Sequence, residues 1–115
     1  MSRKQTAGRD NLGAFAPQFA QLNDDVLFGE VWSREDELSA RDRSMITIAA
    51  LVSGGNFEQL RAHLTLGRAH GITREEIAGM LTHLAFYCGW PKAWSAFTLA
   101  KEIFGDDPDS KATQA

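Results

Sequence analysis

The residue of this sequence that is best suited to moving protons is His63, because an unperturbed imidazole titrates near neutral pH. Counted from Leu60, offsets of three, four and seven place His63, Leu64 and Gly67 on one helix face. The apolar neighbours predict that this face is directed inward. Two interpretations follow: a core histidine bonded to a backbone carbonyl, or a histidine that faces a ligand. Gly67 either leaves room for that ligand or lets two helices pack closely.

Glu30 and three arginines are the candidate charged groups. Glu30 lies in the apolar segment 28–32, where a carboxylate needs a partner, so we consider it a candidate acid or anchor. The alternative is a solvent-facing position on a short helix. Arg34, Arg41 and Arg43 lie near the start of the next helix, where a guanidinium can hold a carboxylate through two parallel hydrogen bonds. We expect one arginine of this group to face a pocket and the others to form ion pairs with Glu35, Asp36, Glu37 or Asp42.

Other residues able to do chemistry carry simpler interpretations. His70 lies in the last turn of the same helix as His63, where its charge complements the helix dipole. Cys88 is the only cysteine, which excludes an internal disulfide and a metal site made of cysteines alone. A redox role needs a second thiol, so we expect Cys88 in the core. Tyr87, Trp90 and Trp94 concentrate aromatic area, which is typical both of subunit contacts and of pocket walls.

Length and composition predict one domain over residues 1–115, with residues 1–11 and 106–115 as mobile tails. The chain is 43% hydrophobic and 23% charged, with a net charge of -3, so it has neither the basic excess of nucleic-acid binders nor the composition of a disordered chain. No apolar run is long enough to span a membrane, and the first residues lack the apolar core of a secretory signal. We therefore expect a cytoplasmic protein without nucleic-acid or membrane partners.

The elements that must position these residues are all helices. Apolar residues recur at helical spacing, and no period-two alternation predicts a strand. Pro17 breaks or restarts a first short helix, and a second short helix follows Asp24 and Asp25, which suit its negatively charged first turn. Four longer helices follow, joined by short connections that favour antiparallel neighbours. The sequence thus predicts an all-α, bundle-like domain of about six helices.

Start and stop signals mark the four longer helices. We expect segment 45–52, within the first of them, to be buried on nearly all sides because it is continuously apolar. The start signals are capping residues or a first-turn proline, namely Ser39 with Asp42, Asn56, Thr73 with Glu76, and Pro91. The stop signals are glycines, namely Gly54-Gly55, Gly71, Gly89 and Gly105.

Several separated motifs together resemble the carboxymuconolactone decarboxylase family over about four fifths of the chain. Because they occur in order, the resemblance is more specific than one short match. The motifs are Val31-Trp32-Ser33-Arg34, Arg41-Asp42-Arg43, His63, Gly71-Ile72-Thr73-Arg74-Glu75-Glu76 and Tyr87-Cys88-Gly89-Trp90-Pro91.

The resemblance implies a helical fold related to alkyl hydroperoxidase D, assembled as a homo-oligomer, usually a trimer or hexamer. The redox relatives carry a Cys-x-x-Cys pair, which this sequence lacks, so it is similar to the decarboxylase branch, whose chemistry belongs to aromatic compound catabolism. The implied site has His63 as proton donor, Glu30 orienting it, and Arg34 or Arg41 anchoring a substrate carboxylate. The substrate-binding surface would add Trp32, Tyr87 and Trp90.

This sequence also departs from the decarboxylase branch, where Pro-Gly commonly follows the Trp-x-Arg stretch. Here Arg34 precedes Glu35-Asp36-Glu37, which leaves the exact substrate open. A γ-carboxymuconolactone carries its carboxylate beside a vinylogous lactone carbonyl that can accept the electrons as carbon dioxide leaves. We therefore expect neither a metal nor a cofactor.

The leading hypothesis is a carboxy-lyase acting on a small carboxylated lactone. Two hypotheses from other classes remain: a thiol-dependent antioxidant protein that uses Cys88, and a non-catalytic oligomeric ligand-binding protein. In any of these, Phe86, Trp94 and Phe104 are expected to expose more apolar area than a monomer carries.

Overall fold

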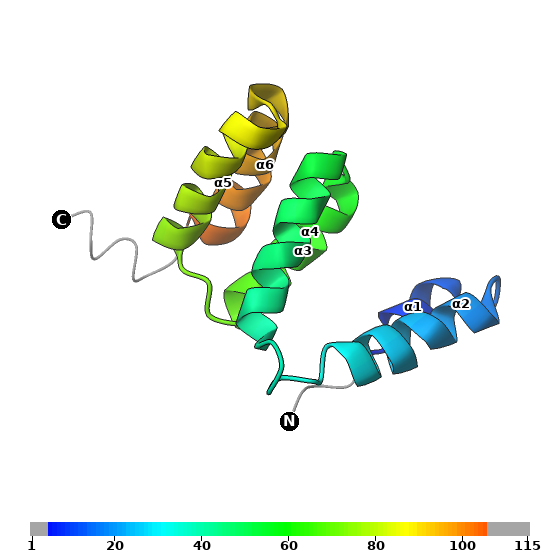
Figure 1. The fold of residues 1–115 in the computed structure, drawn as a ribbon. Helices are drawn as coiled ribbons and strands as arrows, with labels where there is room; N and C mark the ends of the chain where they lie inside the picture. The colour runs from blue at the N-terminus through cyan, green and yellow to red at the C-terminus, as the bar shows by residue number, and fades with distance from the viewer. Residues whose placement is uncertain (1–4, 106–115) are drawn as a thin grey trace. The chain divides into compact units, whose positions relative to one another are not determined.

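The computed structural model describes residues 5–105 and divides the chain into two compact units, Met1–Ala40 and Arg41–Ala115. We call the described parts, residues 5–40 and 41–105, the N-terminal unit and the C-terminal unit. Residues 5–105 contain helices and no strand, which confirms the predicted all-α fold of about six helices. The elements in Figure 1 are α1 (Ala7–Leu12), α2 (Pro17–Gln21), the π-helix η1 (Leu22–Val31), α3 (Ala40–Gly54), α4 (Phe57–Ala69), α5 (Arg74–Cys88) and α6 (Trp90–Phe104).

The mobile tails are predicted at residues 1–11 and 106–115. Residues 1–4 and 106–115 lie outside the described residues, whereas residues 7–11 form most of α1. The single domain over residues 1–115 stays a prediction. No helix within residues 5–105 combines the length and the apolar character that a membrane crossing requires.

Asp24 of η1 is bonded to the first turn of α1 in the N-terminal unit. Its buried carboxylate accepts hydrogen bonds from the backbone N–H groups of Gly8 and Arg9, at 2.8 and 3.0 Å, and so satisfies the first turn of α1. Arg9 also pairs with Asp25 at 2.8 Å. Both aspartates lie in the first turn of η1, as predicted for a short helix, but their partners belong to a helix about 15 residues earlier. Sequence spacing within one helix could not predict that link.

The second short helix predicted around Trp32 is a π-helix rather than an α-helix. Its i→i+5 pattern continues to Trp32, whose N–H bonds to the carbonyl of Leu27 at 2.9 Å. Pro17 begins α2, which confirms the predicted restart, because a proline in the first turn lacks only an N–H that has no partner within the helix.

The C-terminal unit has a continuous apolar core. Its α5 and α6 lie side by side and antiparallel in Figure 1, joined by Gly89 alone at a φ of 104° that a glycine adopts without strain. The core combines the apolar faces of α4, α5 and α6 with the inner face of α3. Its buried members are Ile48, Val52, Leu60, Leu64, Ile72, Ile77, Leu81, Ala96, Ala100 and Phe104.

The expectation that segment 45–52 is buried on nearly all sides is wrong. One face of α3 is buried, through Ser44, Ile48 and Val52 at offsets of four, whereas the side chain of Ile46 is 58% exposed. A continuously apolar run therefore still presents a single inward stripe here.

The four longer helices begin and end at or beside the predicted signals, with Pro91 as the second residue of α6 rather than the first. Thr73 and Glu76 form the complete capping box: the Thr73 hydroxyl accepts from the Glu76 N–H, and the Glu76 carboxylate accepts from the Thr73 N–H. Asn56 directly precedes α4, but its side chain makes no capping hydrogen bond. Gly71 has a φ of 100°, as the predicted left-handed stop requires.

Candidate functional site

His63 lies in the middle of α4, between the fully buried Leu60 and Leu64. Its side chain is half-buried and its Nδ1 atom is buried. Burial lowers the pKa of His63 below its ordinary value of about 6.5, and positive charge on His70 lowers it further. The imidazole is therefore held in a mainly neutral state near pH 7, and its protonated form is a stronger acid than a free imidazolium.

His70 is the second histidine of the same helix face, seven residues after His63. Its Nδ1 lies 2.8 Å from the hydroxyl of Ser44 on α3. Ser44 is fully buried, so this hydrogen bond fixes the His70 ring against the inner face of α3. We call His63, Gly67, His70 and Ser44 the α3–α4 polar cluster.

The surroundings of Gly67 decide between the two roles considered for it, namely room for a ligand and close packing of two helices. A Cβ atom at this position would lie 3.0 Å from Cδ1 of Ile72, 3.1 Å from Cδ1 of Ile48 and 3.6 Å from Cβ of Ser44. These distances indicate close helix packing rather than vacant space beside the glycine. Gly67 thus lets α4 approach α3 closely enough for the bond between Ser44 and His70.

Arg41 lies one turn before Ser44 on α3, beside the connection between α4 and α5. Its guanidinium pairs with the carboxylate of Glu76, and its side chain lies near Gly71. The hydrogen bond from the backbone of Thr73 and the pairing with Arg41 lower the pKa of Glu76. The pair places a cation and an anion, both partly exposed, at the end of the C-terminal unit that carries His70.

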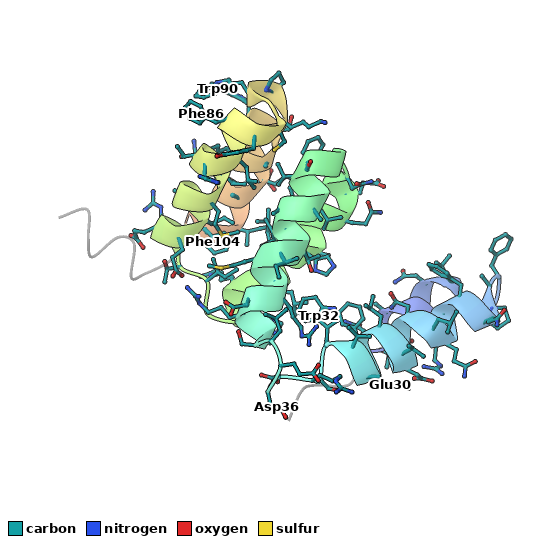
Figure 2. All side chains as sticks on the ribbon, in the orientation of Figure 1. Glu30, Trp32, Asp36, Phe86, Trp90 and Phe104 are labelled. Atoms are coloured by element: carbon teal, nitrogen blue, oxygen red, sulfur yellow. The ribbon has the colours of Figure 1, made fainter. Side chains whose placement is uncertain are left out.

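Three predicted site residues belong to the N-terminal unit. Glu30 is exposed and projects from η1 in Figure 2. Trp32 is buried and stacks on Phe28, with ring centroids 5.6 Å apart. Arg34 binds Glu37 through two hydrogen bonds of 3.0 and 2.5 Å, an ion pair of the kind predicted for arginines that do not face a pocket. The pairing of Glu30 with His63 joins residues of different units and stays a prediction.

The predicted aromatic residues lie at the junction of α5 and α6. Tyr87 and Trp90 are 78% and 60% exposed, and Trp90 meets Phe86 edge to face at 6.0 Å (Figure 2). Phe86 and Trp94 are also strongly exposed, as expected. The same expectation for Phe104 is wrong: its ring is 1% exposed, because it completes the stripe of α6 that enters the core.

Cys88 packs partly buried against the core, as predicted, and its thiol donates to the carbonyl of Leu84 at 3.0 Å. Among residues 5–105, histidine, cysteine, aspartate and glutamate side chains do not gather in any group of three that could hold a metal ion.

A groove of about 380 Å³ lies between α4 and α6, apart from the α3–α4 polar cluster. None of the predicted catalytic or substrate-binding residues lines it, although Trp94, one of the aromatic residues considered for a pocket wall, does. Its walls are formed by Phe57, Glu58, Arg61, Trp94, Ser95, Thr98 and Leu99.

The sequence does not identify Ser44 as part of this cluster, and it indicates no hydrogen bond from His70 to a neighbouring helix. It assigns His70 only to the helix dipole, although an offset of seven from His63 already places both imidazoles on one face. Ser44 gives no such signal, because its role depends on the approach of α3 to α4 at Gly67.

Comparison with known proteins gives consistent results. The sequence model of the carboxymuconolactone decarboxylase family matches residues 17–102. A 4-carboxymuconolactone decarboxylase of Acinetobacter baylyi is 35% identical over 97 residues, covering 84% of this chain and 72% of that protein. A nitrosuccinic acid decarboxylase of Metarhizium robertsii is 26% identical over 99 residues, covering 86% and 68%. An uncharacterized 15.0 kDa protein of Paracoccus denitrificans is 30% identical over 87 residues, covering 74% and 64%.

Proposed function

The chain belongs to the carboxymuconolactone decarboxylase family, and from this premise we propose that it is a cofactor-independent carboxy-lyase in which His63 delivers a proton to carbon. The observation that carries the proposal is the half-buried imidazole of His63, held in mid-helix with a pKa lowered by burial. Two relatives named as decarboxylases support the reaction class.

The proposed substrate is a small carboxylated lactone of the γ-carboxymuconolactone type. The substrates in the two relatives' names share one chemical property. In the lactone, the ring carbon that bears the departing carboxylate is linked through the ring double bond to the lactone carbonyl; in nitrosuccinic acid, a carboxylate is attached to the carbon that bears the nitro group. In both cases an electron-withdrawing group of the substrate accepts the electron pair of the breaking bond, so no external electron sink is required.

The proposed reaction has two steps. The bond between the ring carbon and the carboxylate breaks, carbon dioxide leaves, and the electron pair moves into the lactone as a dienolate. The His63 imidazolium then transfers its proton to a carbon of the dienolate and becomes neutral. Partial burial of His63 favours this transfer, because it makes the imidazolium a stronger acid.

One of the other predicted site residues receives a supporting role in this proposal. Arg41, which pairs with Glu76, is proposed to bind the carboxylate that the substrate retains, whereas the roles of Arg34 and Glu30, both in the N-terminal unit, stay predictions. The substrate contacts of Trp32, Tyr87 and Trp90 stay predictions from the family resemblance, since Trp32 belongs to the N-terminal unit and the side chains of Tyr87 and Trp90 are 78% and 60% exposed.

The direct test is to mix purified protein, treated with a metal chelator, with γ-carboxymuconolactone and to follow the loss of its conjugated absorbance together with carbon dioxide release. We expect turnover that a chelator does not reduce. The Cys88→Ser protein serves as a matched control and should retain the activity, because its thiol bonds only to a helix carbonyl of the same chain. Folded protein that releases no carbon dioxide from this lactone would exclude the proposed substrate.

A further inference from the structure

His70, which directly follows α4, gives the site a feature that the proposed reaction does not use. His63 and His70 lie on one face of the helix, and seven residues correspond to about 10 Å along the axis. His70 is half-buried and is tied to the fully buried hydroxyl of Ser44 at 2.8 Å. Its ring is therefore kept on the face that carries His63 instead of being free to rotate into solvent.

We propose that His70, oriented by Ser44, is a positioning residue of the His63 site, and that a positive charge on its ring favours release of the proton from His63. This proposal deepens the proposed function, since it assigns control over the acid form of His63. A serine hydroxyl suits the role, because it can donate to a neutral imidazole nitrogen and accept from a protonated one. The bond can thus persist in both charge states of His70.

The surrounding charges support this assignment. Arg41 on α3 is paired with Glu76 on α5, so the two neutralise one another beside His70. Elsewhere on these helices, Arg61 pairs with Glu102 of α6, and Arg68 donates to the carbonyl of Ile103. The remaining charged residues on the neighbouring turns are Asp42, Arg43, Arg74, Glu75 and Lys101. None of these is a histidine, so His70 is the one imidazole among the groups named here.

Two charges about 10 Å apart in a partly aqueous setting change one another's protonation by on the order of a few tenths of a pKa unit. The positive charge of His70 accordingly contributes to the lowered pKa of His63, after burial. Because burial remains when His70 is replaced, we expect a partial return of this pKa toward its ordinary value.

The test is an NMR titration of the histidine side chains in the full chain. In the His70→Gln protein we expect the pKa of His63 to rise by on the order of a few tenths of a unit, whereas His70→Arg, which keeps a positive charge, should leave it low. The matched control is His83→Gln. His83 is exposed and stacks on Tyr87, so its removal should not change the titration of His63.

The wild-type titration itself provides a second measurement that does not depend on a variant folding. Because the expected interaction is only a few tenths of a pKa unit, the His63 curve should follow a single proton, with its midpoint below about 6.5. A wild-type midpoint at or above this value, or the same His63 pKa in wild-type and folded His70→Gln protein, would overturn the proposal.

The NMR titrations and the decarboxylation assay can fail independently of one another. If the protein decarboxylates the lactone, the limb of its pH–rate profile that reports His63 should move in His70→Gln by the same amount as the NMR pKa. If no substrate is turned over, the NMR titrations still decide whether the two histidines are coupled.

Discussion

His63 combines two properties that oppose one another in a proton donor. Burial makes its imidazolium more acidic, which favours proton transfer to carbon, but it also reduces the fraction of the protein that carries the proton near pH 7. A small downward change of the pKa is compatible with both needs, since the ideal catalytic pKa lies near the working pH. A deeply buried imidazole would rarely be protonated at all.

This balance predicts the pH dependence of the reaction. If the imidazolium of His63 is the donor, kcat/KM is high at acidic pH and falls as the pH rises through the pKa of His63 in the folded protein. Since burial and His70 lower that pKa, the decline should be centred below about 6.5. The measurement is kcat/KM from about pH 5 to 8, with protein stability checked at each pH. A rate that increases across this range would show that His63 acts as a base instead.

Asp24 shows how one side chain determines an element at a distance. Burial disfavours its charge, but hydrogen bonds from Asn23 and from the backbone of Arg9 and Gly8 outweigh burial and lower its pKa. Removing the carboxylate in Asp24→Ala should open the first turn of α1. Amide hydrogen exchange at Gly8 and Arg9 should then become much faster, while protection in α4 and α5 changes little.

The control for this prediction is Asp25→Ala, which removes only an exposed ion pair with Arg9 and should leave those amides protected. The pH dependence has a definite sign. Because the folded-state pKa of Asp24 is lowered, its stabilisation is present above the ordinary value of 3.8 and is lost as the pH falls through the folded-state pKa. Equal exchange rates in the two variants would contradict the assigned cap.

Two glycines within helices provide a matched test of packing. A Cβ atom at Gly79 of α5 would meet no neighbouring atom within 4 Å, so Gly79→Ala should raise the free energy of unfolding by about 0.5–1 kcal/mol through helix propensity alone. At Gly67 the added Cβ atom would press against Ile48 and Ile72, so Gly67→Ala should raise the free energy of unfolding by less than Gly79→Ala does. Gly67→Leu should lower the stability by about 1–3 kcal/mol.

Denaturant unfolding of these variants measures the difference directly. If Gly67→Leu were as stable as the wild type, there would be open space beside α4, and the bond between Ser44 and His70 could not be attributed to close helix approach. The Gly79→Ala protein shows whether a helical glycine gives the expected gain when packing does not oppose it.

The helices of the C-terminal unit could be predicted from sequence because their signals are local. The stripes Leu60-Leu64 and Ile77-Leu81 and the capping box at Thr73 depend on neighbours within one or two turns. What could not be predicted depends on tertiary approach: Asp24 capping a helix elsewhere in the chain, and Ser44 reaching His70. The helix face of His63 is evident from the sequence, whereas its link to His70 requires the structure.

At the scale of the whole molecule, exposed aromatic side chains are the feature that a single chain leaves unexplained. Phe86, Trp90 and Trp94 expose between 60% and 77% of their surface at the junction of α5 and α6 and along α6. Burial of such residues in a subunit contact would contribute roughly 25 cal/mol for each Å² of apolar area removed from water. We therefore predict self-association through this surface.

Sedimentation velocity of the purified chain should give a mass several times 12.7 kDa. Trp94→Glu, which introduces charge into the exposed aromatic surface, should shift the distribution toward single chains, while Phe15→Glu tests a still more exposed position in the N-terminal unit. A wild-type protein that sediments as one chain at micromolar concentration would contradict the prediction.

The most direct test of the proposed chemistry is the decarboxylation rate of His63→Gln compared with His83→Gln. If His63 delivers the proton, His63→Gln should lower kcat for γ-carboxymuconolactone by about 10² to 10⁴, because the amide cannot act as a general acid in this pH range. His83→Gln should remain close to the wild-type rate, since His83 is exposed and stacks on Tyr87. A folded His63→Gln protein that decarboxylates the lactone at the wild-type rate would contradict the assignment of His63.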